Sequence, residues 1–204
     1  MILSDDAWND WAPDAVVLPV FDNDYATPSL LRPEIEGIGI ADCTLLQSIP
    51  DDWMGEVAGW CSPDRIVDIR GGVASFLCIQ TLRQGKTAPR PRSATNLWFP
   101  EHAGVYYATG HEATVDKMHA VLTDNDWNAN QAYVASARLT SRLKGRRSHW
   151  EVTVRGGCIV VGNLELLDVS DIGREPPQHP RPRALVAEER VGLARGISAL
   201  LGIP

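Results

Sequence analysis

Residues 131–161, QAYVASARLTSRLKGRRSHWEVTVRGGCIVV, decide the fold. Small or apolar residues alternate with polar ones from Tyr133 to Thr140, and a period of two is typical of a strand. A basic turn leads from there into Trp150 and a second alternating run, and Gly156 and Gly157 supply a tight turn before the apolar run at 158–161. We predict a three-stranded antiparallel meander. The alternative is that residues 131–143, which are rich in Ala, Leu and Arg, form a helix.

Other short β-branched, apolar or aromatic runs predict strands at residues 16–18, 44–46, 65–69, 73–82 and 105–107. One internal helix is expected from Thr109, because Thr109 and Glu112 have capping-box spacing and apolar positions recur at residues 115, 118, 119 and 122. Shorter helices are expected after Ser4 and after Asp51. The fold class is therefore α+β, with a mostly antiparallel sheet.

The C-terminal part contains a proline-rich segment followed by an amphipathic pattern. Pro176, Pro177, Pro180 and Pro182 predict a semi-rigid tether over residues 174–183. Apolar residues at helical spacing predict a C-terminal helix within residues 184–204, which docks on the body or exchanges between subunits of an oligomer. Residues 1–173 are expected to form a single α+β domain with an acidic N-terminal region.

Charge is unevenly distributed along the 204 residues. The chain has 19 Lys and Arg against 26 Asp and Glu, a net charge of −7, which argues against a dedicated nucleic-acid binder. The first 56 residues hold twelve carboxylates and one arginine, a local net of −11, so the remaining 148 carry +4. No apolar run is long enough to span a membrane and no secretion signal is visible, so a cytoplasmic protein is expected. The four cysteines form no C-x-x-C pair, which favours buried reduced thiols.

Two short stretches match parts of known cofactor and metal motifs, but the neighbouring residues that those sites need are missing. Gly85-Lys86-Thr87 resembles the end of a phosphate-binding loop, but Pro89 and Pro91 forbid the helix that must follow. The H-x-E at residues 149–151 has no P-C-x-x-C partner downstream. We therefore predict no cofactor and no metal, and the sequence leans against an enzyme.

One His/Glu group remains as an alternative catalytic site. Glu101 and His102 precede the predicted strand at 105–107, and His111 follows it, so their side chains have the opportunity to converge for acid–base work. Against this, Glu112 is accounted for by the capping box, and His119 lies on an apolar stripe, where a hydrogen-bonded core histidine is common.

Two tryptophans lie among aspartates near the N-terminus. Aromatic anchors ringed by carboxylates suit a surface for a basic protein partner. The alternative is a tryptophan-stapled helix that covers a sheet edge. The basic loops at residues 83–92 and 142–147 are either a phosphate-binding patch, solvated turns, or partners of the acidic region. The candidate partner contacts are Asp5, Asp6, Trp8, Asp10, Trp11, Asp14, Asp22 and Asp24.

Residues 97–107, LWFPEHAGVYY, together with Ala41-Asp42-Cys43 and Trp150-Glu151-Val152, resemble immunity proteins of bacterial polymorphic-toxin systems. In some of these, a Pro-Glu-His-Gly turn leads into a strand and a helix. The likeness covers about a quarter of the chain, and the proline-rich loop at residues 88–93 departs from it. The resemblance implies a cytosolic protein that binds and blocks a toxin and needs no active site.

The leading hypothesis is thus a non-enzymatic, immunity-type inhibitor that binds a basic toxin through an acidic face, without nucleic acid or membrane. One alternative is an enzyme that uses Glu101, His102 and His111. Another is a structural or phage-type assembly protein whose C-terminal helix exchanges between subunits.

Overall fold

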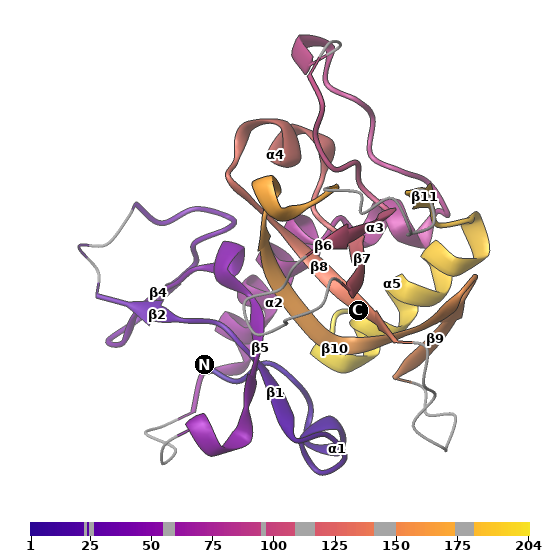
Figure 1. Ribbon diagram of the computed structural model, residues 1–204. Helices are drawn as coiled ribbons and strands as arrows, with labels where there is room; N and C mark the ends of the chain where they lie inside the picture. The colour runs from indigo at the N-terminus through magenta and orange to yellow at the C-terminus, as the bar shows by residue number, and fades with distance from the viewer. Residues whose placement is uncertain are drawn as a thin grey trace.

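The computed structural model describes residues 1–22, 24, 27–54, 60–94, 97–108, 117–140, 150–173 and 182–204. In these ranges, helices are combined with antiparallel sheets, which confirms the predicted α+β class (Figure 1). No helix of the described part has the length and apolar character needed to cross a membrane.

The meander predicted from residues 131–161 is present. Strand β8 (Tyr133–Thr140) and strand β9 (Glu151–Val154) pair with opposite edges of β10 (Gly157–Asp168), both antiparallel. Gly156 has a φ of 88° in the turn between β9 and β10, a conformation that glycine adopts without strain. The strand prediction for residues 133–140 is confirmed, and the helical alternative is wrong.

These strands belong to a six-stranded sheet in the order β11-β6-β7-β8-β10-β9, completed by β6 (Gly104–Ala108), β7 (Lys117–Val121) and β11 (Arg183–Ala184). One face, which includes Ala120, Ala137 and Leu164, packs into the main core. The other face carries a smaller apolar cluster that includes Val121 and Val134. The sheet is therefore covered on both faces.

The internal helix predicted from Thr109 is wrong where the structure describes it. Lys117–Val121 is strand β7, paired with β6 on one side and β8 on the other. Apolar Met118, Ala120 and Leu122 also fit a period of two, and pairing at both edges satisfies the backbone groups better than an isolated helical turn. Thr109, His111 and Glu112 lie outside the described residues.

The strands predicted at residues 65–69 and 73–82 are also wrong. They form helix α2 (Pro63–Phe76) and helix α3 (Ile79–Arg83). Pro63 occupies the first helical turn, where its missing N–H is not needed. Ile69, Val73 and Phe76 then bury one helical stripe, and this tertiary burial overrides the local preference of Ile and Val for strands.

The remaining short elements connect these layers. The strand predicted at residues 44–46 is wrong: Asp42 accepts a hydrogen bond from the Thr44 N–H (3.0 Å) and caps a 3-10 turn, η1 (Cys43–Leu45). The helix predicted after Asp51 starts as η2 (Asp51–Trp53), and residues 55–59 lie outside the description. The other connecting elements are η3 (Arg92–Ala94), α4 (Asn125–Asn130) and η4 (Val169–Asp171).

The N-terminal part forms small sheets beside the large one. Helix α1 (Asp6–Asn9) confirms the predicted helix after Ser4. One sheet has two strands, β1 (Asp14–Val17) and β5 (Gln47–Pro50). The other has three short strands in the order β2 (Val20–Phe21), β4 (Gly39–Ala41) and β3 (Glu34–Ile35).

This N-terminal part is attached to β10 where the pairing of β10 with β8 is interrupted, between Ile159 and Leu164. The Ser48 hydroxyl donates to the carbonyl of Gly162 and accepts from the N–H of Leu164 (3.0 Å), so it satisfies groups that the ladder leaves open. The Trp8 ring lies against Gly162 and is only 1% exposed. Trp8 is therefore a staple over the sheet, the alternative that the sequence left open.

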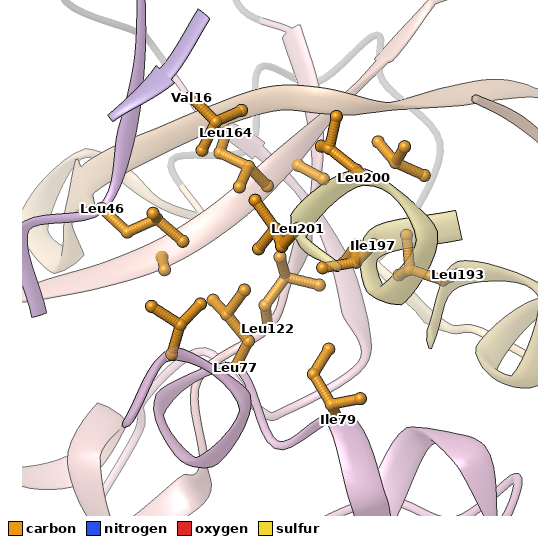
Figure 2. Close-up of a cluster of buried hydrophobic side chains, with 14 of the residues drawn as sticks. Val16, Leu46, Leu77, Ile79, Leu122, Leu164, Leu193, Ile197, Leu200 and Leu201 are labelled. Carbon is orange, nitrogen blue, oxygen red and sulfur yellow. The ribbon is translucent and has the colours of Figure 1, made fainter. Parts of the chain in front are cut away.

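Helix α5 (Ala187–Leu201) confirms the predicted C-terminal helix and ends at Gly202, which has a φ of 59°. Figure 2 shows Leu193, Ile197 and Leu201 of α5 gathered with residues of β10 and of the α2–α3 region in one cluster. Arg183, at the end of the predicted tether, lies in β11, while residues 174–181 are outside the description.

Gly162→Ala is predicted to destabilise the protein, because a Cβ at Gly162 would lie 2.1 Å from the Trp8 ring. We expect a loss of about 1–3 kcal/mol in the free energy of unfolding, measured by urea denaturation. Gly71→Ala is the control: nothing lies within 4 Å of its added Cβ in α2, so it should stabilise by about 0.5–1 kcal/mol. In a Trp8→Ala background the Gly162→Ala cost should shrink; an undiminished cost would disprove the staple.

Candidate functional site

A tight turn at residues 101–104 carries the candidate site, just before β6. The Gly104 N–H donates to the Glu101 carbonyl (2.9 Å), and Ala103 takes a φ of 59°, a rare conformation for a residue with a side chain. The Ala103 N–H donates to the Val121 carbonyl (2.8 Å), which ties the turn to the end of β7. Strain of this kind persists only where the surroundings hold the backbone in place.

Tyr106 folds back over the turn. Its hydroxyl accepts from the Glu101 N–H (2.9 Å), and a Cβ at Gly104 would lie 2.4 Å from the Tyr106 ring. Gly104 is therefore required for this ring position. Burial is the main cause that raises the pKa of Tyr106, so the phenol keeps its proton and can donate it in a hydrogen bond.

His102 is 2% exposed and held in one tautomer. Its Nδ1 accepts from the Ala88 N–H (2.8 Å), so the proton of the neutral ring lies on Nε2. This Nε2 is buried and has no hydrogen-bond partner in the described structure. Burial lowers the pKa of His102 to about 4; Asp124 opposes this shift and Arg190 adds to it. At neutral pH, His102 is thus an uncharged donor with an unused N–H.

Asn125 binds this histidine segment to the proline-rich loop. Its Oδ1 accepts from the His102 N–H (2.8 Å), and its Nδ2 donates to the Ala88 carbonyl (2.7 Å). Asn125 is the first residue of α4, which Asp124 caps by accepting from the Trp127 N–H. The loop, the turn and the start of α4 are therefore held as one unit around His102.

Glu101 is oriented by Arg90. The Arg90 guanidinium approaches Glu101 Oε1 at 2.7 Å, lies over the Phe99 ring at 4.8 Å and donates to the Leu97 carbonyl (2.6 Å). Both ion-pair partners are about half exposed, so the pair contributes roughly 0–1 kcal/mol to stability. Its consequence is positional: a carboxylate is held at the mouth of a cavity.

The cavity has a volume of about 540 Å³, within the range of small-molecule sites. Four segments of the chain form its walls: the proline-rich loop, the turn with β6, the start of α4, and β11. The lining residues are Thr87, Ala88, Pro89, Arg90, Glu101, His102, Gly104, Tyr106, Asn125, Pro182, Arg183 and Ala184.

The cavity wall at β11 is fixed to α5. Arg183 pairs with Glu189 at 3.0 Å, and the Glu189 carboxylate also accepts from the Val186 N–H (2.9 Å). Burial alone would raise the pKa of Glu189, but the hydrogen bonds from Arg155, Val186 and Arg183 lower it below its ordinary value. Arg183 is therefore a structural clamp on the cavity wall.

Two of the predicted catalytic residues, Glu101 and His102, line this cavity, whereas His111 lies outside the described residues. His119 is buried in the sheet, 3.3 Å from the Ser136 hydroxyl, which fits the core histidine weighed from the sequence. Tyr106 was missed; the Gly104-x-Tyr106 spacing, which puts both residues on one face of a strand, is the signal that could have found it. Within the described ranges, no three His, Cys, Asp or Glu side chains gather closely enough for a metal ion.

The predicted partner contacts near the N-terminus differ in burial: some are exposed and others are not. Trp8 is buried and its Nε1 donates to the Asp14 carbonyl (2.7 Å), so it does not present a binding surface. Asp5 caps α1 through the Trp8 N–H, while Trp11 remains 39% exposed. The carboxylates of Asp6, Asp10, Asp22 and Asp24 are exposed. Contact between these residues and a basic partner stays a prediction.

The first basic loop, residues 83–92, bonds to residues that lie outside the acidic first 56. Arg83 donates to the Ser198 hydroxyl (2.8 Å), and Arg90 pairs with Glu101. Residues 142–147, the second basic loop, lie outside the description.

Neither a protein-family model nor a curated protein sequence matches the chain. Solved structures similar to about half of it include an endoribonuclease in complex with its cognate antitoxin from mycobacterial species, at 18% identity over 50% of this chain and 95% of that one, with a TM-score of 0.43. MazF from Deinococcus radiodurans is 21% identical over 52% and 99%, with a TM-score of 0.40. A MazE–MazF structure from the same organism is 19% identical over 52% and 100%, with a TM-score of 0.39.

These structures correct the leading hypothesis. The interpretation as an immunity-type toxin inhibitor is wrong: the similar structures are an endoribonuclease bound to its cognate antitoxin and MazF proteins, and none of those named above is an immunity protein. Two of them were solved with a protein antitoxin.

Two buried histidines predict a loss of stability in acid. Burial lowers the pKa of both His102 and His119 to about 4, against 6.5 in the unfolded chain. Between these values the unfolded chain binds more protons, so the free energy of unfolding should fall as pH falls from 7 to 4, by up to roughly 3 kcal/mol per histidine.

Urea denaturation between pH 7 and pH 4.5 measures this dependence. His119→Gln, which keeps a polar group beside Ser136, should remove about half of the histidine contribution to the slope. An unchanged slope in this variant would contradict the assignment.

Proposed function

We propose that the chain is an enzyme of general acid–base chemistry, with its active site in the cavity at Glu101 and His102. The observation that supports this most strongly is that Glu101, oriented by Arg90, lines one cavity together with His102 and Tyr106.

The roles follow from protonation. Glu101 is a carboxylate positioned by Arg90, which suits it to accept a proton. Tyr106 lines the same cavity and keeps its phenolic proton, so its hydroxyl can donate a hydrogen bond to a substrate oxygen that becomes negative in the transition state. His102 is neutral at physiological pH, and its bond to the Ala88 N–H holds the turn that carries Glu101. His111, the third residue of the predicted catalytic group, is not needed for this arrangement.

Glu101→Gln is the decisive variant. It keeps the size of the side chain and removes the proton acceptor, so turnover should fall by about 100-fold or more. Substrates are screened as a panel of esters, phosphoesters, glycosides and small carbonyl compounds, with NMR as the common readout.

Glu165→Gln is the matched control. Glu165 pairs with Arg138 at 3.5 Å in the sheet and does not line the cavity, so this variant also loses an ion pair but should keep activity. Equal thermal midpoints for the two variants would show that both fold. No turnover across the panel, or turnover equal in the two variants, would refute the proposed function.

A further inference from the structure

A second cavity, the α2–α3 cavity, lies between one face of α2, the start of α3 and the turn that follows α5. Its volume is about 750 Å³, within the range of small-molecule sites. It shares no lining residue with the cavity at Glu101, so what it binds does not depend on the proposed function. Among the lining residues that the structure describes, Arg70 carries the only charged side chain.

Arg70 has no acidic partner in the part of the chain that the structure describes. It is half-buried, and neither a hydrogen bond nor an ion pair of its guanidinium is present there. Asp68, the acid closest to it along α2, pairs with Arg65 at 3.4 Å. The positions three and four residues away on the helix hold Ile66, Val67, Val73 and Ala74. The helix therefore supplies no carboxylate to this cation.

The thiol in the lining does not neutralise the cation either. Burial is the main cause that raises the pKa of the Cys78 thiol to about 12, and Asp124 adds to the shift. Cys78 is therefore uncharged at neutral pH, and the cavity has a net positive lining.

The guanidinium is oriented for end-on recognition. Its Nε is buried and without a partner, so the two Nη nitrogens are the donors that a ligand in the cavity can reach. A Cβ at residue 202 would lie 2.5 Å from Nη2 and 2.6 Å from Cζ, so Gly202 is what leaves room for the guanidinium beside the turn after α5. Two N–H groups side by side match the two oxygens of one carboxylate.

We propose that the α2–α3 cavity binds a small organic monocarboxylate, with the carboxylate on Arg70 and an apolar body against the rest of the lining. Val67, Ala74 and Ile203 suit a hydrocarbon or aromatic body. A single guanidinium balances one negative charge, which favours a carboxylate over a phosphate dianion. An ion pair in a partly apolar cavity is also stronger than the same pair on an open surface.

The test measures binding of benzoate and hexanoate to the full chain by calorimetry, with benzamide, hexanamide and inorganic phosphate as comparison ligands. At least one carboxylate should bind at millimolar concentrations or below. The carboxamides, which keep the shape and lose the charge, and phosphate, which lacks the apolar body, should bind about 10-fold more weakly or worse.

Arg70→Gln should weaken carboxylate binding about 10-fold or more, because it removes the ion pair. Arg65→Gln is the matched control. It removes the same charge from the same helix, but Arg65 pairs with Asp68 and does not line the cavity, so the affinity should stay within about twofold of wild type.

A second variant fills the cavity and keeps Arg70. Gly71 lines the cavity, and nothing lies within 4 Å of a Cβ added there. Gly71→Leu should therefore fold and abolish carboxylate binding, whereas Gly71→Ala, which adds a single methyl group, should retain most of it. If Arg70→Gln does not fold, the comparison of these two variants decides.

Carboxylate binding that is lost in Arg70→Gln and Gly71→Leu and kept in Arg65→Gln, with thermal midpoints that show folded variants, supports the site. Four results would each overturn it: no carboxylate bound at millimolar concentrations, equal affinity of Arg70→Gln and wild type, equal affinity for acid and amide, or phosphate bound more tightly than either carboxylate.

Discussion

The close approach of Trp8 to Gly162 is the contact on which the arrangement of the fold depends. Strand β10 pairs with both β8 and β9, but its ladder with β8 is interrupted between Ile159 and Leu164. A side chain at Gly162 would exclude the indole, and without Ser48 the open carbonyl and N–H of β10 would lack these partners. The irregularity in β10 is therefore the place where the N-terminal part is joined to the sheet.

The same sheet positions the cavity through its opposite edge. β6 begins directly after the 101–104 turn, and β11 covers the beginning of β6 by pairing with Val105 and Gly104. Because β11 is clamped to α5 by Arg183 and Glu189, the packing of α5 in the core also sets the cavity wall. Tyr106 links the sheet to the 101–104 turn: its backbone pairs with His119 in the sheet, and its hydroxyl accepts a hydrogen bond from the turn.

Local pattern was enough for elements whose partners are close in sequence. The alternation in residues 133–140 and the glycine turn before β10 specify a meander, and the stripe of α5 specifies a buried helical face. It failed where two periods fit the same residues: residues 117–122 match both a helix and a strand, and only pairing with β6 and β8 decides. At residues 65–82, burial against the core outweighed the strand preference of β-branched residues.

The candidate site was predictable by residue type only. Glu101 and His102 stood out as adjacent titratable groups, but the contacts that define their chemistry come from Ala88, Arg90 and Asn125, which are distant in sequence. The tautomer of His102 depends on one backbone N–H in a proline-rich loop, and the prolines of that loop indicate from the sequence alone only that no helix follows Gly85-Lys86-Thr87. No linear spacing encodes that hydrogen bond.

The uneven charge takes on a different meaning in the folded chain. The first 56 residues have a net charge of −11 and the rest +4, which suggested attraction between the two parts. Among the described residues, the contacts that join them include the indole against Gly162, the edge-on packing of Trp8 on Trp150, and the hydrogen bonds of Ser48. Arg83 and Arg90 bond to Ser198 and Glu101, both outside the first 56 residues. These apolar and hydrogen-bonding contacts depend little on salt, and the carboxylates of Asp6, Asp10, Asp22 and Asp24 remain in contact with solvent.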